Sequence, residues 1–305
     1  MAAKRSKILT IVGPTGAGKT KFAIEIAKKS NGEIISADSR QIYKYLDIGT
    51  AKPTFEECRQ IKFHLIDIIT PDQTYSCGQF ARDAGQKIEE IEKRGRLPMV
   101  CGGTGLYIRA LFNPLHHLPQ SDPIVKEKLL NILKEKGVEF LYKRLLSVDP
   151  QWASIIKPKD RQRILRGLEV YEITGQPLSE LIKSKKPDAK YQPYYIGINL
   201  PREELYKKIN ERFDNMIKGG LIEEVKKILN MGYRPDCPGL RTIGYREIVA
   251  YLQGKLTRSE AIEKAKQQTR NFARRQLTWF GKIPDIEWHQ PYEVAQIITK
   301  ILCKD

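Results

Sequence analysis

The segment from Gly13 to Thr20 reads Gly-Pro-Thr-Gly-Ala-Gly-Lys-Thr, and these residue types at this spacing can bind a chain of phosphates. In such a loop successive backbone N–H groups surround a di- or triphosphate. Lys19 would place a cation on the phosphate oxygens, and the Thr20 hydroxyl could hold Mg²⁺. The motif predicts a ligand with a pyrophosphate group, the alternative being an ordinary glycine-rich turn. The candidate diphosphate-binding residues are Gly13, Pro14, Thr15, Gly16, Ala17, Gly18, Lys19 and Thr20.

Two further polar residues follow apolar runs. Asp38 comes directly after Glu33–Ala37, where it could be a Mg²⁺-linked acid, a substrate anchor or a general base, or could cap a following helix. Thr104 lies in a Gly-Gly-Thr-Gly turn after Leu97–Cys101. It could bond a ligand oxygen or cap the helix that begins at Leu106. Position alone leaves these alternatives open.

Four arginines are candidates with less local support. Arg212 lies beside the apolar face of a predicted helix, and periodicity favours a solvated or salt-bridged arginine over a catalytic one. Arg161, Arg163 and Arg166 lie close together in the sequence. They could clamp RNA phosphates, close over a nucleotide like a kinase lid, or form a solvated helix face.

The elements that must position these residues alternate between strand and helix. Helical spacing follows the phosphate loop over 21–30 and recurs over 76–94. Continuous apolar strands separated by helices predict an α/β fold, a P-loop NTPase-like parallel sheet flanked by helices. Ligands of such sheets bind at the carboxyl ends of the strands, so one site could collect the phosphate loop, Asp38 and Thr104. The predicted strands are Ile8–Val12, Glu33–Ala37, Phe63–Ile69, Leu97–Cys101 and Tyr194–Leu200.

An inserted all-helical domain is predicted between the fourth and fifth strands. Asp122-Pro123 is typical of a helix start, and a second helix is expected over 160–174. The predicted domains are therefore a catalytic core of residues 1–117 and 191–305 and an insertion of residues 118–190. The helices expected after the last strand are Pro201–Lys218, Leu221–Met231, Ile243–Leu252 and a long helix from the Thr257 capping box to about Phe280.

The charge balance predicts an acidic partner. The net charge is +17, from 53 Lys and Arg against 36 Asp and Glu. Nucleic acid is the first expectation and an anionic membrane the second, although a lysine-rich proteome would give the same balance. Five widely spaced cysteines without a C-x-x-C pair indicate a reducing compartment and argue against a zinc site. No apolar run reaches about 18 residues, so we expect a cytoplasmic protein with no membrane contact.

The sequence also resembles a family, the bacterial tRNA dimethylallyltransferases, or tRNA isopentenyltransferases. The resemblance covers almost the whole chain. The phosphate loop is shared with many unrelated proteins, whereas the block Asp47–Pro53 in combination with the others is specific. The blocks that carry it are Gly13–Thr20, Ser36–Tyr43, Asp47–Pro53, Gly102–Thr104 with Tyr107, Gln162–Arg166, Arg241–Arg246 and Thr269–Trp279.

The resemblance implies transfer of a dimethylallyl group from dimethylallyl diphosphate to the exocyclic amine of adenosine 37 in tRNA. Asp38 would be the general base, Lys19, Thr20 and Mg²⁺ would neutralise the departing pyrophosphate, and Thr104 and Arg212 would assist. A monomer is expected, and a P-loop small-molecule kinase is the alternative. The positions that match tRNA contacts of the family are Asp38, Ser39, Arg40, Gln41, Thr104, Lys126, Gln162, Arg163, Ile164, Leu165, Arg166, Arg241, Thr242, Ile243, Gly244, Tyr245 and Arg246.

Overall fold

The structure is a computed structural model of the chain, and it describes residues 5–116, 118–183, 188–293 and 297. The chain divides into two compact units. Residues 1–113 and 189–305 form the first, here called the core unit, and residues 114–188 form the second, the inserted unit. The sequence placed these boundaries a few residues later, after 117 and after 190.

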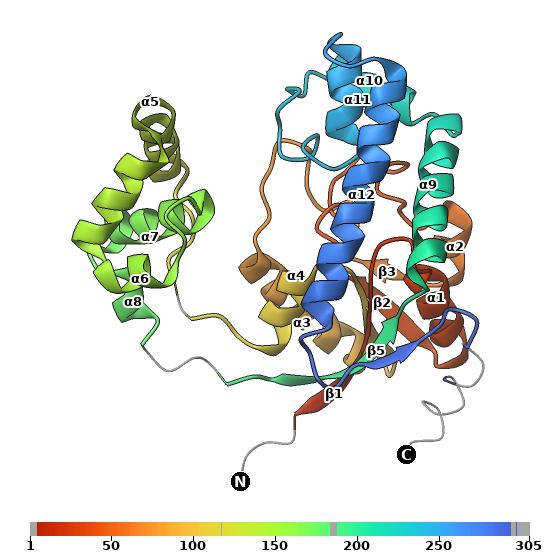
Figure 1. The fold of residues 1–305 in the computed structure, drawn as a ribbon. Coiled ribbons are helices and arrows are strands. Elements are labelled where there is room, and N and C mark those ends of the chain that lie inside the picture. The colour runs from red at the N-terminus through yellow and green to blue at the C-terminus, as the bar shows by residue number, and fades with distance from the viewer. Residues whose placement is uncertain (1–4, 117, 184–187, 294–296, 298–305) are drawn as a thin grey trace. The chain divides into compact units, whose positions relative to one another are not determined.

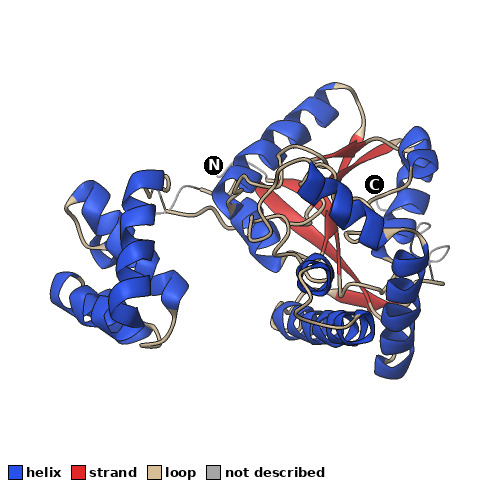
Figure 2. Cartoon of the chain, turned by 90° about the horizontal axis from the view of Figure 1, so that it is seen from above, coloured by secondary structure: helices blue, strands red, loops and turns tan. Residues whose placement is uncertain are grey.

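The core unit is built on one sheet of six parallel strands, in the order β3-β2-β4-β1-β5-β6 (Figures 1 and 2). The predicted fold class is therefore confirmed. The strand that carries the phosphate loop, β1, lies between β4 and β5, so its carboxyl end is at the middle of the sheet edge. The strands are β1 (Ser6–Val12), β2 (Gly32–Ser36), β3 (Phe63–His64), β4 (Leu97–Gly102), β5 (Tyr191–Ile198) and β6 (Glu287–His289).

Two strands differ from the prediction. The run Phe63–Ile69 joins the sheet only at its first two residues, because Leu65 and Asp67 adopt left-handed backbone conformations with φ of 60° and 58° and turn the chain away. Its last residue, Ile69, instead forms an isolated bridge with Tyr43. The sequence did not predict β6, since three residues among polar neighbours carry too little alternation to be recognised.

Helices cover both faces of the sheet, as Figure 2 shows. Leu9 and Ile11 of β1 face a cluster that includes α1 and α9, whereas Ile8 and Val12 face a cluster with α3 and α4. This alternation follows from the two-residue period of a strand. The helices of the core unit are α1 (Lys19–Lys29), α2 (Phe55–Gln60), α3 (Cys77–Lys93), α4 (Gly105–Phe112), α9 (Arg202–Lys218), α10 (Leu221–Asn230), α11 (Tyr245–Leu252) and α12 (Arg258–Phe280).

A third cluster lies where α10, α11 and the first half of α12 pack against the loop that follows β2. Ile42 and Leu46 of that loop are buried among Val225, Ile248 and Ala261. The capping box predicted at Thr257 begins α12, with both of its reciprocal hydrogen bonds present. This cluster matters for the site because it fixes the chain on either side of residues 241–246.

The inserted unit is all-helical. Within its longest helical stretch Gly137 has a φ of 79° and a ψ of 174°, which are not helical, so one helical segment ends there and a second one follows. Leu141, Leu145 and Leu168 are fully buried at the centre of the unit. No helix among the described residues of either unit is long and apolar enough to span a bilayer. The helices are α5 (Pro123–Val148), α6 (Pro150–Ile155), α7 (Arg161–Thr174) and α8 (Leu178–Leu181).

One buried carboxylate joins two of these helices, and its removal should destabilise the inserted unit. Asp149 accepts hydrogen bonds from Trp152 N–H at 3.0 Å and from Ser179 N–H at 2.8 Å and is 1 % exposed. Asp149→Ala should lower the free energy of unfolding by about 2–3 kcal/mol, because a cap is lost and a buried N–H is left unpaired. Asp149→Asn retains one acceptor and should cost less. Urea unfolding followed by hydrogen exchange over 149–181 measures both, and equal losses would contradict the cap assignment.

Candidate active site

The phosphate loop connects β1 to α1 and depends on glycine at three positions. Gly13, Gly16 and Gly18 have φ values of 142°, 87° and 88°, a region that other residues rarely adopt. A Cβ at position 13 would also lie 2.1 Å from the Ile198 carbonyl oxygen of β5. The helix α1 begins at Lys19, so its N-terminal N–H groups face the loop and favour an anion there.

Two cations lie at this loop. The ammonium of Lys19 donates a hydrogen bond to the Pro14 carbonyl at 2.7 Å, and burial lowers the pKa of Lys19 to about 8. Arg212, from α9, donates from Nη2 to the Thr15 hydroxyl at 2.6 Å, and burial lowers its pKa as well. The interpretation of Arg212 as a solvated arginine is therefore wrong. The charge of Asp38 acts in the opposite direction on both groups, which places all three close together.

The ends of β2 and β4 hold Asp38 beside Thr104. The Ala37 N–H donates to the Cys101 carbonyl at 2.8 Å, and the Thr104 N–H donates to the Ala37 carbonyl at 3.1 Å. The Thr104 hydroxyl accepts from the Ser39 N–H at 3.0 Å and makes no hydrogen bond that caps α4. Thr104 therefore stands at the N-cap position of α4, but its hydroxyl binds the Ser39 backbone and does not cap the helix.

Asp38 is not a helix cap either. Its Oδ1 accepts from the Arg40 N–H at 2.8 Å, which is a local turn, and the next helix begins only at Phe55. Its Oδ2 accepts no hydrogen bond from any residue that the structure describes. A half-buried carboxylate with one oxygen held and the other open is suited to accept a proton.

One cavity of about 280 Å³ brings these groups together. Thr15, Asp38 and Arg212 line it, so the phosphate loop, the acid and the α9 arginine share a single site. The strand-end argument predicted the loop and Asp38 there; Thr104, its third member, does not line the cavity and reaches it through Ser39. The exposed Arg40, Arg241 and Arg246 of the sequence-predicted set also line it.

The sequence missed the apolar wall of this cavity. Ile209, Phe213 and Met216 of α9 line it with Phe272 of α12, and Arg275 adds another cation. The periodicity showed that this face of α9 is apolar, but one face can cover a core and line a cavity. Arg275 lies in the Thr269–Trp279 block, which carried the family resemblance without a role for any one residue.

Tyr245 belongs to the predicted tRNA-contacting set, but its side chain is fully buried. The Glu224 carboxylate accepts from the Ile48 N–H at 2.9 Å and from the Tyr245 hydroxyl at 2.5 Å. The Gly49 N–H donates to that hydroxyl at 3.0 Å, and burial raises the pKa of Tyr245. Tyr245 therefore supports the loop that begins at Asp47 and cannot contact RNA through its side chain. Thr242, at 5 % exposure, is likewise buried.

Gln41 ties the same loop to the end of β2. Its Oε1 accepts from the Ser36 hydroxyl at 2.9 Å, and its Nε2 donates to the Ala51 carbonyl at 3.0 Å. The amide is thus largely occupied within the protein. The specific block Asp47–Pro53 owes its position to Gln41 on one side and to Glu224 on the other.

In the inserted unit, Lys126, Gln162 and Arg163 of the predicted set are exposed. Arg163 makes only a long ion pair with Asp160, at 3.6 Å. These side chains are free to meet a partner of the unit.

Three neighbours in the same block make contacts within the unit. Ile164 is fully buried and Leu165 packs against the same cluster. Arg166 donates to the Glu169 carboxylate at 2.8 Å and to the Pro119 carbonyl at 2.6 Å, which fixes the start of the unit. The side chain of Ile164 is therefore closed to a partner, whereas Leu165 and Arg166 are partly exposed and remain predicted contacts.

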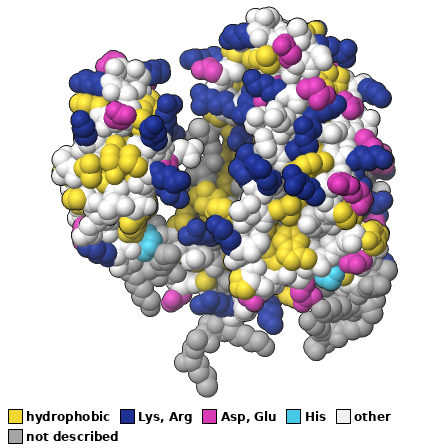
Figure 3. All heavy atoms as spheres, viewed as in Figure 1, with side chains coloured by type: hydrophobic (Ala, Val, Ile, Leu, Met, Phe, Trp, Pro, Cys, Tyr) yellow, Lys and Arg dark blue, Asp and Glu magenta, His cyan; other side chains and the backbone are white. Residues whose placement is uncertain are grey.

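Lys266, Arg270 and Arg274 recur every four residues along α12, and the first two are engaged within the protein. Lys266 pairs with Asp214 at 2.8 Å, and Arg270 donates to Asn210 Oδ1 at 2.6 Å, so both face α9. Arg274 is exposed. On the face of the core unit seen in Figure 3, Lys and Arg side chains gather along this helix.

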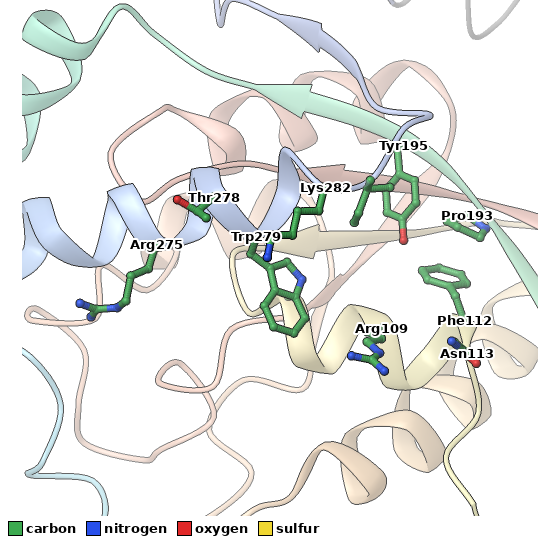
Figure 4. Close-up of a pocket in the computed structure, with 11 residues that line it drawn as sticks. Arg109, Phe112, Asn113, Pro193, Tyr195, Arg275, Thr278, Trp279 and Lys282 are labelled. Carbon is green, nitrogen blue, oxygen red and sulfur yellow. The ribbon is translucent and has the colours of Figure 1, made fainter. Parts of the chain in front are cut away.

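A second cavity of about 610 Å³ is lined by Gly105 together with residues of α4, β5 and the end of α12. Figure 4 shows Trp279 and Lys282 beside one another at the end of α12, with Arg109 and Phe112 projecting from α4. Arg275 lines both cavities. Cations and aromatic rings therefore continue outward from the acid-containing site.

The donor set of the site fits a magnesium ion that is bound mainly by substrate. Among the described residues no three His, Cys, Asp or Glu side chains cluster as a metal site. The phosphate-loop Thr20 supplies a hydroxyl at the start of α1, and Asp38 is the acidic residue that lines the cavity. Mg²⁺ commonly binds through substrate phosphates with one or two protein oxygens, and these residues allow that arrangement.

Comparison with known proteins agrees with this geometry. Residues 41–283 match the model of a family described as IPP transferase. Curated relatives named tRNA dimethylallyltransferase are 46 % identical in Thermoanaerobacter sp. (strain X514) and 49 % identical in Carboxydothermus hydrogenoformans. Each alignment covers 92 % of this chain and 91 % of the relative.

Solved structures give the same result. A full-length tRNA isopentenylpyrophosphate transferase from Bacillus halodurans superposes with a TM-score of 0.71 at 38 % identity, covering 98 % of this chain and 96 % of that one. A eukaryotic dimethylallyltransferase acting on tRNA gives 0.82 at 30 % identity, covering 95 % and 75 %. The chain belongs to the IPP transferase family.

Proposed function

We propose that this protein transfers a dimethylallyl group from dimethylallyl diphosphate to the exocyclic amine of adenosine 37 in tRNA. The observation that carries the proposal is the cavity in which Asp38 faces a phosphate loop, a half-buried arginine and an apolar wall. A five-carbon allylic chain needs such a wall beside the site of its diphosphate.

The donor would be held at both ends. Its diphosphate would lie in the loop, where Lys19, Arg212 and the N-terminus of α1 carry positive charge. Its dimethylallyl chain would lie against Phe213, Met216 and Phe272. Cations aimed at the oxygens from which the chain departs stabilise charge that grows as the bond breaks, and such groups lower barriers strongly.

The acceptor would react beside Asp38. The adenine amine is a weak nucleophile because its lone pair is delocalised into the ring. Its nitrogen forms a bond to the allylic carbon while the bond from that carbon to the diphosphate oxygen breaks and pyrophosphate leaves. The amine proton passes to Oδ2 of Asp38, the oxygen that no described residue occupies. Thr104, which fixes Ser39 at 3.0 Å, keeps the acid in place.

Magnesium fits this scheme as a charge partner of the diphosphate. The Thr20 hydroxyl, with the diphosphate oxygens, would hold the ion, and its charge would favour departure of pyrophosphate. The protein itself supplies the two cations and the acid.

The tRNA would be bound by exposed cations of both units. Arg40, Arg241 and Arg246 line the cavity, and Lys126 and Arg163 are exposed on the inserted unit. An adenine stacked in an anticodon loop cannot reach a cavity, so it would have to flip out, at a cost of a few kcal/mol. The net charge of +17 suits such a partner. A monomer in the cytoplasm remains part of this proposal.

The direct test is mass spectrometry of tRNA incubated with the protein, dimethylallyl diphosphate and Mg²⁺, with labelled ATP in a parallel reaction. One five-carbon unit on adenosine is the expected product. Asp38→Asn keeps the shape and the contact to Arg40 but is no base, so turnover should fall by about 10²–10⁴-fold while both substrates still bind. Asp285→Asn, an exposed matched control, should turn over normally. Normal turnover of Asp38→Asn would remove Asp38 as the base.

Donor binding should weaken in mildly alkaline solution. Only the protonated Lys19 attracts a diphosphate, and its pKa is about 8, so affinity is full below that pH. Above it the affinity should fall by up to about tenfold per pH unit, until the pKa of the complex is reached. Calorimetric titration with dimethylallyl diphosphate between pH 7.5 and 9.5 measures this. Lys19→Arg keeps its charge and should give a flat profile, whereas a flat wild-type profile would contradict the assignment.

Arg163 provides a test of the tRNA surface. Arg163→Ala should weaken tRNA binding and reduce the slope of log K against log salt by about one, since one phosphate contact is lost. Filter binding at several salt concentrations gives the slope. The control is Arg202→Ala, an exposed arginine on α9 outside the predicted contacts. Equal slopes for wild type and Arg163→Ala would mean that Arg163 lies on a solvated helix face and makes no phosphate contact.

A further inference from the structure

Gln276 is a buried amide within an exposed, basic segment of α12. Its neighbours Arg274 and Arg275 are exposed, whereas Gln276 is 6 % exposed. Burying an amide is unfavourable unless its polar atoms are hydrogen-bonded, so we expect partners for both ends of this side chain.

Both ends of the amide bond to backbone that is far away in the sequence. Oε1 accepts from the Thr15 N–H at 2.8 Å, and Nε2 donates to the Gly103 carbonyl at 2.9 Å. Thr15 belongs to the phosphate loop. Gly103 directly precedes Thr104, whose hydroxyl holds Ser39 next to the acid. One side chain therefore spans the donor half and the acceptor half of the site.

The turn is shaped to receive α12. A Cβ at Gly103 would lie 2.2 Å from Nε2 of Gln276, and one at Gly105 would lie 2.1 Å from Nε1 of Trp279. Neither glycine has a positive φ, so space and not backbone conformation requires glycine here. Residues 276 and 279 lie one turn apart on the same face of α12, so the helix approaches this turn closely at two successive points.

We propose that Gln276 is a positioning residue that fixes the separation between the phosphate loop and the Asp38–Thr104 pair. The inference rests on the proposed transfer reaction, because the separation matters only when a donor and an acceptor must meet. The Thr15 N–H, being bonded to Gln276, is unavailable to the diphosphate. Gln276 therefore acts through the geometry of the loop and touches neither substrate.

Removing the Gln276 side chain should reduce the rate of transfer more than it reduces the affinity for either substrate. We call the two hydrogen bonds of Gln276 the brace. Without the brace each substrate can still bind in its own half of the site, but the reacting atoms no longer align. Displacements of about 1 Å can cost on the order of a hundredfold in rate. We expect Gln276→Ala to reduce the single-turnover rate by about ten- to a hundredfold, with the dissociation constants of both substrates changed less than about threefold. Gln276→Glu keeps the acceptor for Thr15 but presents an oxygen to the Gly103 carbonyl, so it should not restore the rate.

A pair of substitutions separates positioning from loss of stability. Gly103→Ala introduces a Cβ that collides with the amide and should slow the reaction, because the turn must shift. In the Gln276→Ala background there is space for that Cβ, so Gly103→Ala should cost nothing further. If the rate reductions of Gln276→Ala and Gly103→Ala multiply in the double variant, the positioning role of Gln276 is contradicted. A normal rate in Gln276→Ala would contradict it as well. The matched control is Gln267→Ala, an exposed glutamine on the same helix, which should react at the wild-type rate.

A second measurement does not depend on activity. Amide hydrogen exchange in peptides covering 13–20 and 102–106 should be faster in Gln276→Ala than in wild type or Gln267→Ala. If wild type transfers no dimethylallyl group, the proposed function fails while this exchange still tests the brace. If wild type is active and exchange is unchanged in Gln276→Ala, the positioning role of Gln276 is contradicted while the proposed function stands.

Discussion

Two half-buried cations beside a single carboxylate are the constraint on which this structure depends. Burial lowers the pKa of both Lys19 and Arg212, so the folded chain bears part of the cost of desolvating positive charge. Asp38 offsets only some of that cost, since buried charges need close partners to be stable. In the proposed reaction a diphosphate would supply the missing negative charge. Without it, the rest of the fold has to hold the two cations in place.

The parallel sheet meets this requirement through its geometry. The ends of β1, β2 and β4 lie side by side, so the phosphate loop, Asp38 and Thr104 come together although some ninety residues separate the first from the last. The pairing continues past the last ladder residues through the Ala37 backbone, which bonds to Cys101 and to Thr104. The backbone that carries Asp38 therefore continues the sheet and is held more rigidly than a loop would be. As the proposed base, its carboxylate would thus be held at the reacting amine by the sheet, without the help of a long side chain.

The sequence predicted those parts of the site whose signals are local. The spacing of the phosphate loop, the apolar runs before Asp38 and Thr104, and the capping boxes each need only a few neighbouring residues. Arg212 gave no such signal, because its role comes from the packing of α9 against the loop. Tyr245 and Arg166 stand within blocks that match tRNA contacts, yet one is buried and the other is tied to Glu169. A motif preserves the shape of a surface as well as the residues that touch a partner, and sequence cannot separate the two.

The helix α12 contacts three parts of the site that lie far apart in the sequence: the phosphate loop, the turn before Thr104 and α9. Gln276 bonds to the phosphate loop and to the turn before Thr104, while Lys266 and Arg270 bond to the helix that carries Arg212. A neutral amide suits the central position: a carboxylate would repel a diphosphate, and an ammonium could donate to Gly103 but could not accept from Thr15. The loop, the turn and α9 are thus fixed against one common element. If Gln276 sets the separation of the two halves as proposed, a change in any one of these contacts would alter the distance between donor and acceptor, and this distance would link the glycine at 103 to the chemistry at Asp38.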